Sequence, residues 1–253
     1  MTNEKPDSQD NSRATKRLDE LKVIFCGPCR DRKAEQQAEA TANQWRSNPV
    51  TCWLTGHSEI ATARCSLGAS VAHHMPDDSD VVVMLDSDVH PDPHTLLGVV
   101  GRAAYDPHAP LVISSYPIRL PPNAEGSDDR LAHYVKTGRV WGGLGCVAMA
   151  AERFRQLHLL GVFEESTEPL IHARQPLVRV TPGGPLSSAP YRVGVYDGQW
   201  LSEDLYFFRH VHRSGVPTVL YPRCSPHGRT LVTSRFKMLD GSPLAPELLL
   251  DDG

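Results

Sequence analysis

Two carboxylates, Asp86 and Asp88, come directly after the apolar run of residues 81–85. Side chains alternate along a strand, so carboxylates two residues apart project to the same side from the end of a buried strand. Such a pair can hold one divalent cation, because Mg²⁺ and Mn²⁺ prefer oxygen ligands and commonly share them with substrate phosphates. The plainer interpretation of Asp86, Ser87 and Asp88 is an acidic turn after a strand, since Asp and Ser favour turns.

A second acidic pair, Glu203 and Asp204, follows Ser202, which suits the N-cap position of a helix. Acids in a first helical turn are stabilised by the helix dipole whatever their function. The same helix terminus is expected to help keep Asp204 ionised, as a general base must be. His227 follows in a Pro- and Gly-flanked turn, and by itself it is unremarkable in a chain with twelve histidines.

Residues 142–145 form a glycine-rich segment, in which residues without a Cβ let the backbone approach a ligand closely. Gly143, Gly145 and Ala148 also match the G-x-G-x-x-G/A fingerprint of dinucleotide sites, and Glu164 lies about the expected distance onward. Only a short apolar run precedes this match, and the stronger β-α-β signal lies earlier in the chain. Dinucleotide binding is therefore the disfavoured interpretation.

These residues must be positioned by the elements around them. Apolar runs predict strands at residues 21–26, 50–54, 81–85, 111–116 and 219–221, and helical spacing predicts helices at residues 32–45, 60–74, 93–103, 150–159 and 202–213. Gly27 and Pro28 are expected to end the first strand with a turn. The β-α-β-α-β order predicts a single α/β domain with a Rossmann-like, mostly parallel sheet and helices on both faces. By fold-level analogy, the first half binds a nucleotide-like or phosphorylated ligand at one sheet edge.

The composition is that of an ordinary globular protein. The 253 residues carry a formal net charge of −4 with scattered Lys and Arg, which gives no basic face for nucleic acid. The polar opening segment lacks the apolar stretch of a signal peptide, and no run reaches membrane-spanning length, so we expect a cytoplasmic protein. Cys26 and Cys29 have C-x-x-C spacing without a second pair, and buried small hydrophobic residues are the favoured interpretation.

An Asp-x-Asp motif after an apolar strand, a glycine loop, a Glu-Asp helix start and a late His occur in this order along the chain. Together they resemble the GT-A class of nucleotide-sugar-dependent glycosyltransferases, and more closely its family-2-like members. In that class the Asp-x-Asp motif binds the metal and the sugar nucleotide, a glycine loop lines the donor sugar, and the Glu-Asp pair faces the acceptor. The resemblance spans about residues 21–229.

The resemblance implies a site for Mn²⁺ or Mg²⁺ with Asp88 and His227 as direct ligands, while Asp86 contacts the ribose or a metal-bound water, or joins the metal ligands. It also implies that Asp204, beside Glu203, removes the acceptor proton in an inverting reaction. The remaining residues expected to bind the donor are Asp86, Ser87, Arg64, Gly27, Pro28, Gly143 and Gly145. Arg64 resembles a basic residue that supports the donor diphosphate, and a solvent-facing helix arginine is the alternative.

The resemblance predicts a glycosyltransferase domain over residues 20–230, with a nucleotide-sugar-binding half (20–120) and an acceptor half (121–230). The ends, residues 1–19 and 231–253, are expected to be tails. The donor is a nucleoside-diphosphate sugar, and a hexose is the expected sugar. The acceptor is an unidentified hydroxyl group on a glycan, small molecule, protein or modified nucleic acid. Trp141 and Trp200 are interpreted as sugar-stacking platforms or as core residues.

Two other functions fit parts of the pattern. Phosphohydrolases of the haloacid dehalogenase type have an apolar strand that ends in Asp-x-Asp-x-Thr/Val, with the first Asp as nucleophile. Here position 90 is His, and the strand is third in order where that family places it first. A non-catalytic sugar-nucleotide-binding protein would share every donor-side feature and differ only at the base.

Overall fold

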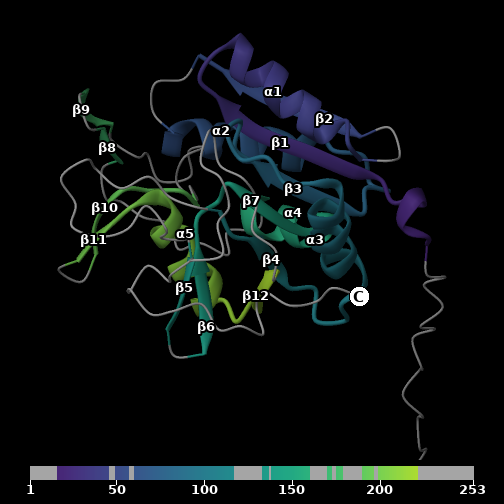
Figure 1. The fold of residues 1–253 in the computed structure, drawn as a ribbon. Helices are drawn as coiled ribbons and strands as arrows, with labels where there is room; N and C mark the ends of the chain where they lie inside the picture. Colours follow the sequence, from purple (N-terminus) through teal and green to yellow (C-terminus); the bar gives the residue numbers. More distant parts are fainter. Residues whose placement is uncertain are drawn as a thin grey trace, which may run out of the picture.

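The computed structural model describes residues 16–45, 49–56, 60–116, 133–136, 138–159, 170–172, 175–178, 190–196 and 199–221. A six-stranded sheet forms the centre of this part, in the order β12-β4-β7-β3-β1-β2 (Figure 1). Its strands are β1 (Val23–Cys29), β2 (Val50–Thr55), β3 (Val81–Leu85), β4 (Leu111–Ser114), β7 (Cys146–Ala150) and β12 (Thr218–Tyr221). Only β7 runs antiparallel to its neighbours, β3 and β4, and the other pairs are parallel.

Helices cover both faces of this sheet (Figure 1). One face carries α2 (Ile60–His74), α4 (Ala151–Leu159) and α5 (Glu203–Arg213), and the other carries α1 (Arg32–Ala42) and α3 (Pro93–Tyr105). The remaining described elements are a 3₁₀ turn and three two-stranded ribbons: η1 (Leu18–Glu20), β5 (His133–Lys136) with β6 (Arg139–Gly142), β8 (Leu170–His172) with β9 (Gln175–Val178), and β10 (Gly194–Tyr196) with β11 (Gln199–Leu201). This is the mixed α/β single domain, with a mostly parallel sheet and helices on both faces, that the sequence predicts.

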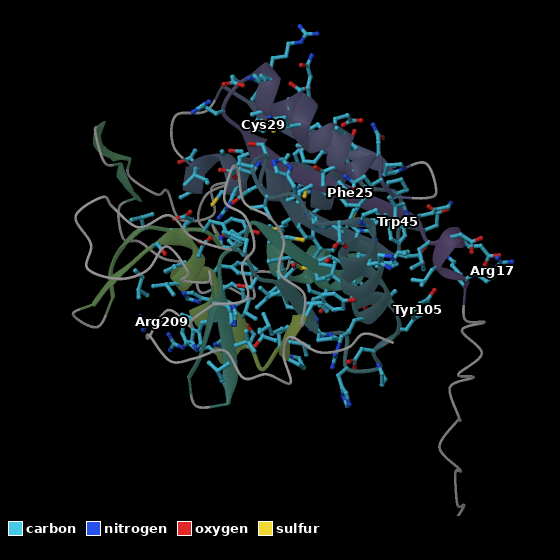
Figure 2. All side chains as sticks on the ribbon, viewed as in Figure 1. Arg17, Phe25, Cys29, Trp45, Tyr105 and Arg209 are labelled. Carbon is cyan, nitrogen blue, oxygen red and sulfur yellow. The ribbon has the colours of Figure 1, made fainter. Side chains whose placement is uncertain are left out.

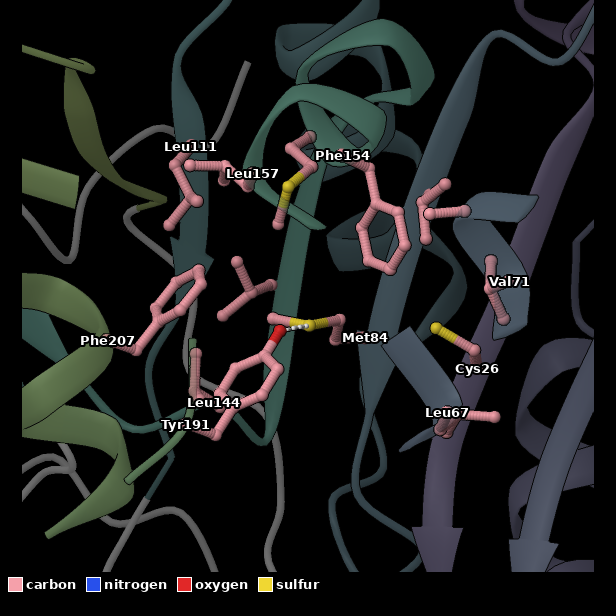
Figure 3. Close-up of a cluster of buried hydrophobic side chains, with 14 of the residues drawn as sticks. Cys26, Leu67, Val71, Met84, Leu111, Leu144, Phe154, Leu157, Tyr191 and Phe207 are labelled. Carbon is pink, nitrogen blue, oxygen red and sulfur yellow. Dashed lines mark hydrogen bonds between the residues drawn. The ribbon is translucent and has the colours of Figure 1, made fainter. Parts of the chain in front are cut away.

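The alternation of side chains along β1 and β3 produces two separate cores. Ile24 and Met84 face α2 and α4, whereas Phe25 and Val83 face α1 and α3. Figure 2 shows Phe25 beside Trp45 on the α1 side, and Figure 3 shows Met84 on the other side. All five residues of β3 are buried, as expected of a strand covered on both faces.

The predicted helices are present, with ends that differ by at most three residues, and α2 has the bounds that the sequence predicts. The expected turn at Gly27 and Pro28 is wrong. Strand β1 continues to Cys29, because Gly27 pairs with Trp53 and Pro28 with Leu54 of the edge strand β2. The dinucleotide interpretation is also contradicted, since the residues after Gly145 form the antiparallel strand β7 and no helix begins there.

Other sequence-based expectations concern exposure. Cys26 and Cys29 are both buried, and burial raises the pKa of the Cys29 thiol to about 12 and that of Cys26 further, so both behave as small hydrophobic residues. Residues 16–19 of the expected N-terminal tail belong to the described part, and residues 231–253 lie outside it. Among the described helices, none combines the length and apolar character needed to cross a membrane.

Gly27 is required by the spacing between β1 and β3. A Cβ at this position would lie 1.8 Å from the Leu85 carbonyl oxygen, which is backbone and cannot rotate away. We expect Gly27→Ala to lower the free energy of unfolding by about 1–3 kcal/mol, the usual cost of overpacking. Chemical denaturation would measure it. Gly101→Ala in α3 is the matched control, because its Cβ meets only the end of the Leu18 side chain and a helical alanine is favourable, so no loss is expected there.

Candidate active site

The Asp-x-Asp motif lies at the carboxyl end of β3, next to the glycine loop. The antiparallel register pairs Leu85 with Cys146, which places Gly145 opposite Asp86. The Asp86 amide donates a 2.9 Å hydrogen bond to the Gly145 carbonyl oxygen. Two of the predicted motifs are therefore joined by the sheet itself. Asp88, two residues further on, is exposed at the surface.

Arg64 of α2 joins this edge of the sheet to the start of α5. Its Nη2 donates to both oxygens of Asp86, at 2.7 and 2.9 Å, and its Nη1 donates to Asp204 at 2.7 Å and to Glu203 at 3.4 Å. The Arg64 side chain is only 6% exposed, so the alternative of a solvent-facing helix arginine is wrong. We call Arg64, Asp86, Glu203 and Asp204 the acid cluster. A buried guanidinium with separate nitrogens for different carboxylates fits this arrangement better than a lysine would.

Local structure places the two acids of α5. Ser202 accepts a hydrogen bond from the Leu205 amide and caps the helix, as predicted, so that Glu203 and Asp204 lie in the first turn. The next turns bury Phe207 and Phe208 in the core, which fixes the direction of the helix. The acids are thereby directed toward Arg64 and the end of β3.

The acid cluster has an excess of negative charge, because one guanidinium faces three carboxyl groups. Burial, together with the charges of Glu203 and Asp86, raises the pKa of Asp204 to about 7, although Arg64 acts in the opposite direction. The helix terminus was expected to help keep Asp204 ionised, but burial has the larger effect, so that Asp204 is only partly ionised at neutral pH. A carboxyl group with a pKa near 7 can both accept and release a proton under physiological conditions.

A small cavity lies behind the acid cluster. Gly27, Pro28, Arg64 and Asp86 all line it, together with apolar side chains of α2, β3 and α4. Its volume of about 20 Å³ admits a water molecule but no nucleotide. Four of the predicted donor-binding residues are thus brought together around one cavity.

Tyr191 packs beneath the acid cluster, and sequence analysis did not single it out. Figure 3 shows its hydroxyl next to Met84 and its ring near Phe207. The hydroxyl donates to the Met84 sulfur at 3.0 Å and lies 2.9 Å from Nε2 of His158, and the ring stacks on Phe207 at 5.0 Å. The Cys65 thiol, beside Arg64, donates to the Tyr191 carbonyl. Tyr191 thereby connects the elements that carry Arg64, Asp86 and Asp204.

Trp141 and Gly143 are described by the structure but are not members of the acid cluster. Trp141 on β6 is half-buried, and its indole meets the His212 ring edge-on at 4.7 Å, so it packs against α5. Of its two interpretations, this contact favours core packing. His227 lies outside the described residues, as does the side chain of Trp200. Gly143 is buried in the loop between β6 and β7.

A divalent cation would have oxygen ligands at this edge of the sheet. The described ranges contain no group of three or more His, Cys, Asp or Glu side chains arranged to hold a metal. Asp88 and Asp86 supply one or two carboxylates, which suits Mg²⁺ or Mn²⁺, because these ions commonly complete their coordination with water and substrate phosphates. The excess negative charge of the acid cluster also favours a cation nearby.

Comparisons with known proteins give distant structural similarities. No protein-family model and no curated protein sequence matches the chain. The crystal structure of A197 from STIV is 15% identical, with a TM-score of 0.45, over 79% of this chain and 81% of that one. The catalytic domain of Drosophila β1,4-galactosyltransferase 7 with xylobiose is 15% identical, with a TM-score of 0.41, over 79% of this chain and 64% of that one. A mutant of that enzyme with manganese, UDP-Gal and xylobiose gives a TM-score of 0.40 at the same identity.

Proposed function

We propose that this chain is a metal-dependent glycosyltransferase that moves a sugar, most simply a hexose, from a nucleoside-diphosphate sugar to an acceptor hydroxyl. The acid cluster is the observation that carries the proposal. It joins the Asp-x-Asp motif at the end of β3 to the acidic start of α5 through one buried arginine, Arg64. A donor-side motif and a general base must lie together in such an enzyme, and these two motifs meet in the folded chain.

The proposed reaction is inverting. The acceptor hydroxyl attacks the anomeric carbon on the face opposite the leaving group, its proton passes to the Asp204 carboxylate, and the bond to the diphosphate oxygen breaks. Asp204 is suited to this task because its pKa of about 7 matches the working pH of a general base. Arg64 holds Asp204 in place and balances part of the charge.

The diphosphate would be held by residues at the carboxyl end of β3. Asp88 and His227 are the proposed metal ligands. Asp86, which accepts two hydrogen bonds from Arg64, is proposed to contact the ribose or a metal-bound water. A divalent cation bound there would stabilise the negative charge of the leaving nucleoside diphosphate. The glycine loop, with Gly143 and Gly145, is the proposed lining for the donor sugar.

The phosphohydrolase alternative is disfavoured by the sequence order: position 90 is His where that family has Thr or Val, and β3 is the third strand along the chain where that family places the motif strand first. The non-catalytic alternative differs only at Asp204, and turnover of a sugar nucleotide separates it from the enzyme.

The metal requirement is tested with Asp88→Ala. Without a cation, the diphosphate and the carboxylates of Asp86 and Asp88 repel one another, so we expect this exposed substitution to abolish Mn²⁺-dependent binding of nucleoside diphosphate while the melting temperature stays unchanged. A thermal-shift screen of UDP-, GDP- and dTDP-sugars with Mn²⁺ first identifies the nucleotide, and calorimetry then compares the variant with the wild type. Unchanged affinity and metal dependence in Asp88→Ala would show that Asp88 is not a metal ligand at this site.

A further inference from the structure

The glycine loop, residues 142–145, connects β6 to β7 and is buried along its whole length. Its end is attached to the central sheet, because the Gly145 carbonyl oxygen accepts a 2.9 Å hydrogen bond from the Asp86 amide. Leu144 packs in the core that lies on the α2 and α4 side of the sheet. Gly142, at the start of the loop, belongs instead to the β5–β6 ribbon, so its position depends on how that ribbon is attached.

His133 attaches the end of the ribbon that carries Gly142. It is the first residue of β5 and pairs with Gly142 in the antiparallel register. Its Nδ1 forms a hydrogen bond with the hydroxyl of Ser115, which directly follows β4. Strands β3 and β4 both run antiparallel to β7, so their carboxyl ends lie at the same edge of the sheet. Ser115 therefore holds the ribbon at the edge where Asp86 follows β3.

The imidazole of His133 depends on Ser115 for its orientation. The two side chains are 0% and 1% exposed, so water cannot replace the bond between them. Nε2, the other ring nitrogen, has no hydrogen-bond partner in the described part of the chain. Burial lowers the pKa of His133 to about 4, so the ring is neutral at pH 7 and no charge holds it. The opposite end of the ribbon is attached independently, since Arg139 donates a 2.7 Å hydrogen bond to the His212 carbonyl oxygen.

We propose that Ser115 and His133 are positioning residues that set the selectivity for the transferred sugar by holding Gly142 in place. This inference rests on the proposed function, in which the glycine loop lines the donor sugar. Sugar epimers differ only in the direction of one hydroxyl group, so a loop that distinguishes them must be held in one position. Neither side chain needs to touch the donor, because both act through the backbone of the loop. The nucleoside and diphosphate have their proposed contacts at Asp86 and Asp88, so their binding should not depend on this hydrogen bond.

Ser115→Ala tests the inference, because it removes only the hydroxyl. With the nucleotide identified by the thermal-shift screen, release of nucleoside diphosphate gives kcat/KM for the preferred sugar and for its epimers on the same nucleotide. We expect the ratio of preferred to disfavoured sugar to fall about 3–10-fold, the value of one neutral hydrogen bond, while calorimetry finds nucleoside diphosphate affinity within about twofold of the wild type. Ser214→Ala is the matched control: its hydroxyl donates to the His210 carbonyl oxygen at the end of α5, and its loss should leave the ratio unchanged.

The double variant with Ser115→Ala and His133→Leu separates selectivity from stability. Each single substitution leaves one buried polar partner unpaired, which lowers the melting temperature, whereas replacing both partners by apolar side chains removes that cost. We expect the double variant to regain stability but to keep the lowered sugar ratio, because the hydrogen bond to the ribbon is still absent. It also takes the place of Ser115→Ala in the assay if the single variant is too unstable to purify.

The outcomes distinguish this inference from the function on which it rests. A wild-type sugar ratio in a folded variant that lacks the hydrogen bond would assign the pair to packing alone and would overturn the inference. Proportional loss of transfer and of nucleoside diphosphate affinity would overturn it as well, and both results would leave the proposed function in place. A wild-type chain that neither transfers a sugar nor binds nucleoside diphosphates would overturn both.

Discussion

Asp204→Asn is expected to lower the turnover rate by about 10²–10⁴-fold, with donor affinity nearly unchanged. General-base catalysis is typically worth this factor, and an amide cannot accept the acceptor's proton. The substitution keeps the size of the side chain and the start of α5. The rate is measured as the acceptor-dependent release of nucleoside diphosphate. When no acceptor is known, hydrolysis of the sugar nucleotide by water is measured instead.

Stability measurements separate a chemical effect from a folding defect in this variant. Burial makes the ionised form of Asp204 unfavourable in the folded chain, so the neutral amide should leave the melting temperature at pH 8 equal to or above that of the wild type. Glu203→Gln is the matched control, because Glu203 lies in the same turn and makes the longer contact with Arg64, at 3.4 Å. If Glu203→Gln lost the activity and Asp204→Asn retained it, the base would be Glu203.

The pH dependence has a definite sign. Asp204 must be deprotonated to act as a base, and its pKa of about 7 means that the wild-type rate constant kcat/KM should fall as pH decreases through 7. A carboxylate with an ordinary pKa would keep full activity down to about pH 5. The anomeric configuration of the product, observed by NMR, reports whether the reaction inverts. Retention of configuration would contradict the role given to Asp204.

Strands β1, β3 and β4 of the central sheet could be predicted because they are almost entirely buried. Residues 81–85 are apolar without interruption, and a strand covered on both faces has this pattern whatever its neighbours are. The turn predicted at Gly27 and Pro28 was wrong. This dipeptide usually forms a turn, and the sequence does not show that it pairs with β2. The ribbons β5–β6 and β10–β11 were not predicted either, since short strands outside a core have no strong apolar alternation.

The residues of the candidate site could be chosen from the sequence, but the contacts between them could not. Asp86 and Asp204 could be chosen because each follows a recognisable strand end or helix start. Their connection through Arg64 could not, because the Arg64–Asp204 contact joins residues 140 positions apart in the chain.

Arg64 determines whether the acid cluster can exist. In the described part of the chain, its guanidinium pairs with Asp86, and it also pairs with Asp204 and Glu203. The largest cause acting on its own pKa is burial, which lowers it, and the three carboxylates more than compensate, so that the pKa is raised well above the usual value. The arginine therefore stays charged at neutral pH.

Arg64→Met should lower the free energy of unfolding at pH 7 by about 3–5 kcal/mol, because removing one partner from a buried ion pair leaves the others uncompensated. Arg64→Lys keeps the charge but offers one nitrogen where two reach Asp86 and Asp204, so an intermediate loss of stability is expected. Arg30→Met is the matched control: that side chain is 90% exposed and pairs only with its neighbour Asp31, so no measurable loss is expected.

The pH dependence of the Arg64→Met defect tests its electrostatic origin. Without the guanidinium, the buried carboxyl groups of the folded variant have raised pKa values, whereas the unfolded chain keeps ordinary values near 4. The loss should therefore be complete at pH 7–8, should shrink as pH falls toward 4, and should be smallest below pH 4, where the carboxyl groups are protonated in both states. Denaturation curves of wild type and variant at several pH values measure this difference. A loss that is constant across pH would assign the effect to packing of the long side chain and would contradict the acid cluster as the source of instability.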